Sequence, residues 1–92
     1  MSIDEEMIVC AVRYALGRRT YIVEDVIKYV MMKKDSLSGY CKNIMIRDIE
    51  TEIKTYKRMH LAYELWMFEK AWIELAEVLK GENNDRSVEK SL

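Results

Sequence analysis

Residues 2–17 read SIDEEMIVCAVRYALG, and this stretch predicts the helix around which the rest of the chain is arranged. Ser2 and Glu5 have the spacing of a capping box, in which each side chain accepts a hydrogen bond from the other residue's backbone N–H. Over residues 7–16 only one arginine and one tyrosine carry polar groups. A helix that is apolar nearly all round is typical of a buried position. We therefore expect a central N-terminal helix that stops at Gly17.

A second helix is predicted from about Ile22 to Lys34, because apolar residues recur there at the spacing of one helix face. β-branched residues are frequent in this stretch, so a strand is the alternative, but the length and the spacing favour a helix. The residues expected to face inward are Val23, Val26, Ile27, Val30 and Met31. Residues 35–39, DSLSG, are expected to form a loop.

A third helix is predicted from about Tyr40 to Arg58, and an apolar stripe with alternating steps of four and three residues then runs from Leu61 to Leu79. Nothing between residues 56 and 61 breaks a helix, so one long rod is an alternative. We expect a bend near residues 59–60, because the first two helices need a cover. Gly81 should end the last helix, and residues 82–92 read as a polar tail.

The fold class that follows is a small all-α bundle of three or four helices, with one domain over residues 1–81 and a flexible tail over residues 82–92. The absence of proline and the presence of only three glycines fit helices joined by short turns. The side chains expected in the core are Ile8, Val12, Ala15, Val26, Val30, Ile49, Ile53, Phe68, Trp72 and Leu75.

The net charge of −1 conceals three segments of different charge. Residues 1–9 carry three acids and no base, residues 10–47 carry eight bases against three acids, and residues 48–92 carry seven bases against ten acids. The middle segment is basic enough to attract an acidic partner. The whole chain is neither a basic nucleic-acid coat nor an acidic mimic of one.

Enzyme signatures are absent, so we expect no catalytic residue, no cofactor and no metal. His60 is the one side chain that titrates near neutrality without help, and no nucleophile or carboxylate is spaced to work with it. Cys10 and Cys41 read as two buried, reduced thiols rather than zinc ligands. The longest apolar run is too short to cross a membrane, and the N-terminus is acidic, which together predict a cytoplasmic protein.

The first two helices and the turn between them have the outline of a helix-turn-helix, with Arg18 and Arg19 in the turn. The second helix of that motif enters the major groove by its N-terminal end, and here that end carries Glu24 and Asp25. These carboxylates would be repelled by phosphates, so we do not expect specific DNA reading by this helix. A looser contact of basic side chains with the nucleic-acid backbone stays open.

Partner binding is predicted for basic side chains of the middle segment and for apolar side chains that fall off the stripe of the last helix. Trp and Met are residues that interface cores favour, so this second face suits another copy or another protein. Burial inside the bundle is the alternative. The candidate residues are Arg18, Arg19, Lys33, Lys34, Lys42, Trp66 and Met67.

The run CAVRYALGRRTYIV, residues 10–23, resembles the opening of small phage and prophage proteins with the pattern R-Y-A-L-G-R-x-[ST]-Y. Further matches are the pair Asp48-Ile49 and the residues Trp72, Leu75 and Leu79. The resemblance covers most of residues 8–80, but only its first block is specific. It implies an origin in a mobile element of a bacterial cell, and it transfers no catalytic residues.

The function predicted from the sequence is that of a non-enzymatic, phage-type accessory protein. It would bind a host protein or nucleoprotein complex stoichiometrically and inhibit a host defence system, in the manner of an anti-CRISPR protein. The alternatives are a small helical DNA-binding regulator and a structural homodimer.

Overall fold

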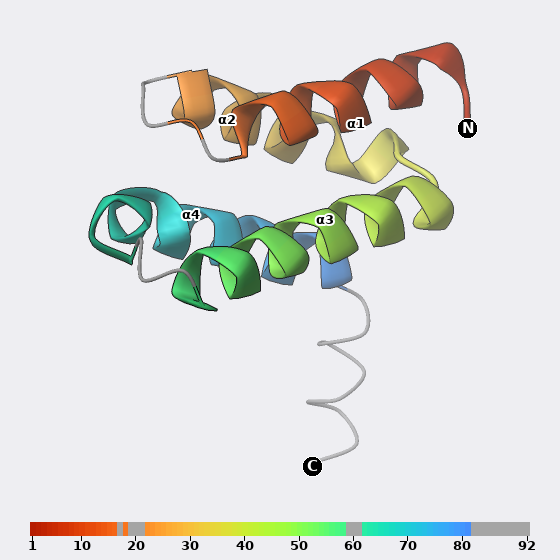
Figure 1. Ribbon diagram of the computed structural model, residues 1–92. Coiled ribbons are helices and arrows are strands. Elements are labelled where there is room, and N and C mark those ends of the chain that lie inside the picture. Colours follow the sequence, from red (N-terminus) through yellow and green to blue (C-terminus); the bar gives the residue numbers. More distant parts are fainter. Residues whose placement is uncertain (17, 19–21, 59–61, 82–92) are drawn as a thin grey trace, which may run out of the picture.

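The computed structural model describes residues 1–16, 18, 22–58 and 62–81, of which Tyr56 and residues 62–67 are described by their backbone alone. Every regular element of this part of the chain is a helix, which confirms the all-α prediction (Figure 1). In chain order the elements are α1 (Ile3–Ala15), α2 (Ile22–Lys33), the short 3₁₀ helix η1 (Lys34–Ser36), α3 (Gly39–Arg58) and α4 (Ala62–Lys80).

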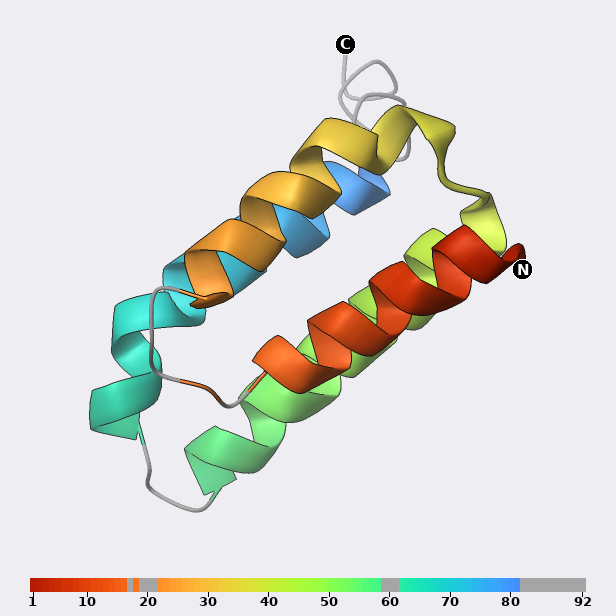
Figure 2. The same cartoon turned by 90° about the horizontal axis from the view of Figure 1, so that it is seen from above.

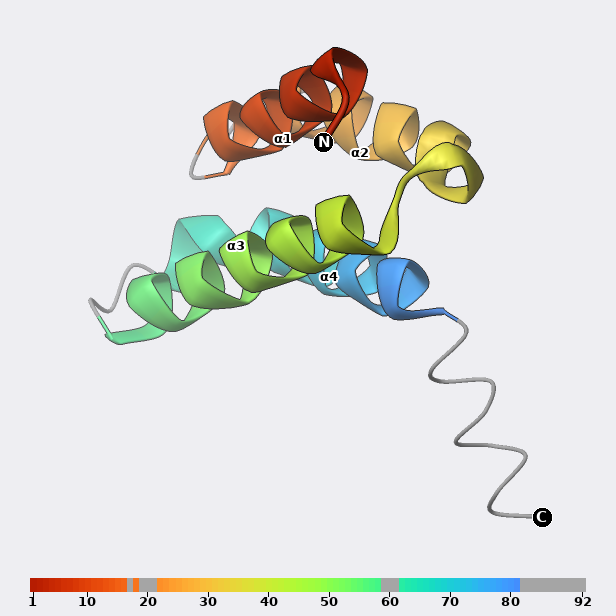
Figure 3. The ribbon, with the colours of Figure 1, turned by 90° about the vertical axis from the view of Figure 1, so that its right-hand side faces the viewer.

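The four helices form two layers of two. Helices α1 and α2 make one layer, and α3 and α4 make the other (Figures 1 and 3). Seen from above, α1 lies over α3 and α2 lies over α4, with the two helices of each layer running in opposite directions (Figure 2). Because α3 and α4 are separate helices that pack side by side, the expected bend is confirmed and the single rod is excluded.

The start of α1 is fixed by the capping box that the sequence predicts. The Glu5 backbone N–H donates to Ser2 Oγ and the Ser2 backbone N–H donates to Glu5 Oε1, each over 3.2 Å. The other oxygen of Glu5, Oε2, accepts from the Ser38 backbone N–H at 2.6 Å. Glu5 therefore both caps α1 and joins this helix to the turn that precedes α3.

One hydrophobic core lies between the two layers. Eight of the ten side chains expected in it are buried, whereas Val26 and Phe68 are partly buried and pack against it. The largest fully buried side chains are Trp72, Met45, Ile49, Leu75, Val12, Val23, Val30 and Cys41. The stripe of the last helix is confirmed from Trp72 to Leu79, while Leu61 and Leu65 lie outside the side chains described.

The expectation that the N-terminal helix is central and buried all round is wrong. The face of α1 with Ile8, Val9, Val12 and Ala15 is buried, but the opposite face is exposed. Two layers of helices explain the error, because a helix in such a bundle turns only one side to the core.

Ion pairs join the helices at the edge of the core. Arg13 Nε donates to Asp48 Oδ2 at 2.7 Å and connects α1 to α3. Lys80 Nζ lies 2.8 Å from Glu50 Oε2, and this pair connects α4 to α3. Helix α4 ends at Lys80, as predicted from Gly81, whose N–H donates to carbonyl oxygens of the last turn. Gly17 and residues 82–92, which the sequence assigns to a stop and a tail, lie outside the described residues.

Candidate interaction surfaces

The basic residues nominated from the sequence do not form one surface. Arg18 follows the C-terminal end of α1, at the end of the bundle where α2 begins. Lys33 ends α2 and Lys34 begins η1, so both lie at the opposite end (Figure 2). The 12 residues of α2 separate the two ends by roughly 18 Å. Lys42, in the first turn of α3, is at the same end as Lys33 and Lys34.

Arg18 has a local aromatic partner in the last turn of α1. Its guanidinium lies over the ring of Tyr14, 4.4 Å from the ring centroid, and its backbone N–H donates to Ala15 O at 2.9 Å. The arginine of α1 that pairs with α3 is Arg13, the residue before Tyr14. Arg19, which was paired with Arg18 in the prediction, lies outside the described residues.

A polar cleft occupies the end of the bundle that carries Lys33. Its volume is about 570 Å³, and it is lined by Ser2, Asp4, Glu5, Ile8, Tyr29, Lys33, Asp35, Ser36, Leu37 and Ser38. The ammonium group of Lys33 lies 5.8 Å from the centroid of the Tyr29 ring. We call this the end cleft; one wall comes from α1 and the other from α2 and η1.

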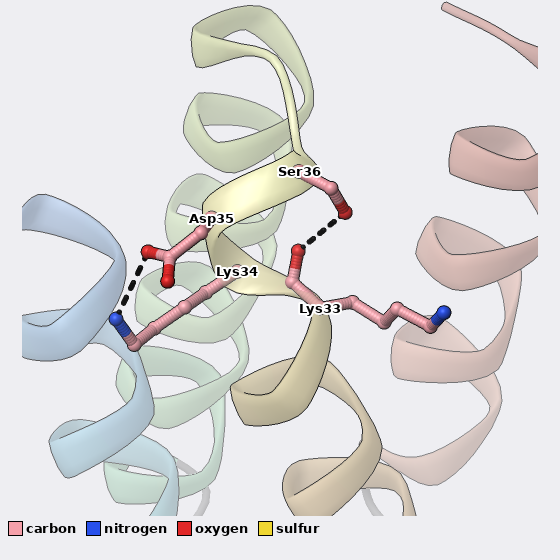
Figure 4. A network of polar contacts seen from close by, with 4 residues as sticks. All are labelled: Lys33, Lys34, Asp35 and Ser36. Atoms are coloured by element: carbon pink, nitrogen blue, oxygen red, sulfur yellow. Dashed lines mark hydrogen bonds and ion pairs between the residues drawn. The ribbon is translucent and has the colours of Figure 1, made fainter.

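The two adjacent lysines at the end cleft point in different directions. Figure 4 shows the side chain of Lys33 extending toward α1, while Lys34 turns to the other side of η1, where its Nζ lies 3.1 Å from Asp35 Oδ1. Ser36 Oγ donates to the carbonyl oxygen of Lys33 at 2.8 Å and closes the turn. Lys33 is therefore the nominated lysine that lines the cleft, and Lys34 is engaged in a local ion pair.

The acidic wall of the end cleft is held by the cap of α1. Hydrogen bonds from the Ser38 and Ser2 backbone N–H groups lower the pKa of Glu5 below its ordinary value of 4.5. Asp4 lines the same wall and is exposed. The cleft is thus lined by a cation and by acidic residues, which gives it a mixed charge rather than the basic character expected from the sequence.

Sequence reasoning missed an exposed apolar face on α1. It consists of Ile3, Met7, Cys10 and Tyr14, and we call these four residues the α1 stripe. Ile3 is 75% exposed, Met7 is 65% exposed and Tyr14 is 56% exposed. Their spacing of four, three and four residues is the seam pattern of packed helices. The spacing is visible in the sequence. Because the whole helix was expected to be buried, no exposed apolar face was predicted from it.

The α1 stripe borders a groove between α1 and α2. The groove has a volume of about 490 Å³ and is lined by Ile3, Glu6, Met7, Cys10, Ala11, Tyr14, Ile22 and Val26. Seven of these eight residues are apolar or aromatic or carry a thiol, so the groove differs in character from the end cleft. We call it the α1–α2 groove.

The two cysteines differ, contrary to the prediction that both are buried. Cys41 is buried, and this burial raises the pKa of its thiol. Cys10 is exposed in the α1 stripe. Among the described residues no group of three or more histidine, cysteine, aspartate or glutamate side chains could hold a metal ion.

The remaining candidates from the sequence fall outside what is described. The backbone of Trp66 and Met67 belongs to α4, but their side chains lie outside the described part of the chain. His60 lies outside it entirely. None of the described helices combines the length and the apolar character that crossing a membrane requires.

Comparisons with protein families, with curated proteins and with solved structures found no match to this chain. The resemblance of residues 10–23 to phage and prophage proteins therefore stays a prediction.

Proposed function

We propose that the protein is a phage-type accessory protein that binds a host protein or nucleoprotein complex stoichiometrically, with the end cleft as its binding site. The observation that supports this most is the composition of the cleft, which Lys33 and Tyr29 line together with Asp4 and Glu5 of α1. A site with both signs of charge suits a protein surface that also carries both signs. Inhibition of a host defence system is the action that such binding would produce.

Exposed apolar side chains near the same end add to this proposal. Met32 is 78% exposed, Tyr40 is 65% exposed and Tyr29 is 47% exposed, and all three belong to the end of α2 or the start of α3. Tyrosine and methionine are enriched in the cores of protein–protein interfaces. They would supply short-range contacts after the charged groups have oriented the partner.

The alternative, a DNA-binding regulator, finds less support. Glu24 and Asp25 are exposed in the first turn of α2, and Asp4 is an exposed residue that lines the end cleft at the other end. A polyanion would be repelled by these groups at both ends of α2. Arg18 and Lys33, two of the basic candidates from the sequence, are separated by the length of that helix, so they cannot contact the same phosphates.

Affinity capture from a bacterial host lysate, with and without nuclease, tests the proposal. The wild-type protein should retain a defined protein partner after nuclease treatment, and Lys33→Glu should reduce its recovery about tenfold or more. Lys54→Glu is the matched control, because Lys54 is exposed near the other end of α3. Circular dichroism would establish that both variants keep their helices.

Two outcomes would contradict the proposal. One is the capture of nucleic acid alone, with binding that weakens steeply as salt is raised. The other is equal recovery of the partner by Lys33→Glu and by wild type, which would remove the end cleft from the binding site.

A further inference from the structure

We propose that the α1 stripe is the interface between two copies of this chain, with the two α1 helices packed antiparallel. This inference concerns a different surface from the end cleft and goes beyond the proposed function. It makes a two-fold dimer, rather than a single chain, the unit that meets a partner.

The position of the α1 stripe is the first reason. Ile3, Met7, Cys10 and Tyr14 recur along one line of the helix, and this line lies opposite the buried face with Val12 and its neighbours. A helix that shows an apolar seam on the side away from its own core has a second packing surface. Scattered exposed apolar residues are ordinary on protein surfaces, but four at seam spacing on one short helix form a continuous strip.

The α1–α2 groove is the second reason. Ala11 of α1 and the partly buried Ile22 and Val26 of α2 extend the apolar surface to one side of the stripe. A helix placed in such a groove contacts two helices at once, as helices do in a four-helix bundle. In a two-fold dimer the α1 helix of each copy would occupy the groove of the other, so the same patch serves both copies.

Charge determines the direction in which the two helices run. The first turn of α1 carries Asp4 and Glu6 with exposed side chains and no base, whereas Arg13 and Arg18 lie toward its other end. Arg13 remains accessible, since 58% of its side chain is exposed despite its pair with Asp48. An antiparallel pair brings each acidic end beside a basic end, and Glu6 then lies near Arg13 of the second copy. A parallel pair would bring like charges together.

The antiparallel alignment also matches the apolar residues in size. With the two-fold axis at the middle of the α1 stripe, Ile3 lies opposite Tyr14 of the second copy, and Met7 lies opposite Cys10 of the second copy. Each layer then joins a larger side chain to a smaller one, as interdigitated packing requires. A helix of 13 residues is about 20 Å long, so this interface is at the small end for stable complexes and should dissociate on dilution.

Sedimentation equilibrium of the purified full chain over a wide concentration range tests the proposal. The wild type should form a dimer, and Met7→Glu should weaken the association about 100-fold, because each dimer carries the substitution twice and a tenfold loss at each site multiplies. Ile3→Glu is a second variant with the same expectation, in case Met7→Glu disturbs the helix. Ile73→Glu is the control. It introduces the same charge at an exposed apolar side chain of α4, and this variant should dimerise like the wild type.

A wild type that stays monomeric over the whole range would overturn the proposal. So would dimers that persist in both Met7→Glu and Ile3→Glu, because the contact would then lie elsewhere. Neither result would affect the capture test at Lys33, since that residue lines the end cleft and not the α1–α2 groove.

Discussion

Helices α1 and α3 lie against each other and bury similar side chains, yet they differ on the faces that they turn away from the core. The outer side of α3 carries Arg47, Glu50 and Lys54, all exposed, whereas the outer side of α1 carries the α1 stripe. The inner faces are alike because both helices pack apolar side chains into the same core. The outer side of α3 is charged and therefore suits solvent, whereas the α1 stripe is apolar. That difference indicates a partner for α1.

The largest expected effect tests whether the inner faces share one core. Trp72 of α4 is 1% exposed and belongs to the same cluster as the buried residues of α1 and α3. Trp72→Ala should lower the free energy of unfolding by about 3–5 kcal/mol, because a large cavity replaces the indole ring. Chemical denaturation followed by circular dichroism would measure this. A loss below 1 kcal/mol would mean that α4 does not complete the core.

A smaller effect separates the two faces of α1 itself. Val12 is fully buried, so Val12→Ala should cost about 2 kcal/mol at any protein concentration. Met7→Ala should cost less than about 0.5 kcal/mol in dilute solution, where the chain is a monomer, and more when the protein is concentrated. Thermal denaturation at two widely spaced concentrations compares the variants. Equal costs for Met7→Ala at both concentrations would contradict a role for the outer face in association.

The smallest effect concerns the link between α1 and α3 through Glu5. Its pKa is lowered in the folded chain, so its contribution to stability is present above the ordinary value of 4.5 and is lost as the pH falls through the lower folded-state value. Glu5→Gln should therefore be less stable than the wild type at pH 7, and the gap should narrow in acid below pH 4.5. Melting temperatures measured from pH 7 down to acid would show this. A gap that stays constant with pH would exclude the charge of Glu5 as its cause.

Most of the fold could be predicted from the sequence because helical periodicity and end signals are local. The pattern from Trp72 to Leu79 predicts the buried face of α4, and the pair Ser2 and Glu5 predicts the start of α1. The contact of Glu5 with Ser38 could not be predicted, because the two residues are far apart in the chain and meet only when the helices pack.

The candidate site was harder to predict for a related reason. Basic residues that are near one another in the sequence do not form one basic surface when a helix lies between them. Helix α2 places Arg18 and Lys33 at opposite ends of the bundle. The exposure of the α1 stripe could not be predicted for a different reason. An apolar helix fits either a fully buried position or a position between a core and a partner, and only the arrangement of its neighbours distinguishes these.

The antiparallel pairing of α1 helices can be tested by disulfide cross-linking of two variants in a Cys10→Ser background. An Ile3→Cys chain and a Tyr14→Cys chain are mixed, oxidised mildly and separated without reductant. In the antiparallel pair, residue 3 of one copy lies opposite residue 14 of the other copy. The pairing therefore predicts that the mixture yields a cross-linked dimer containing both variants. Each variant alone should yield little, because its cysteine then lies opposite a residue that is not cysteine. Efficient cross-linking of Ile3→Cys alone would show parallel helices, and no cross-linking in the mixture would show that the α1 stripe is not the interface.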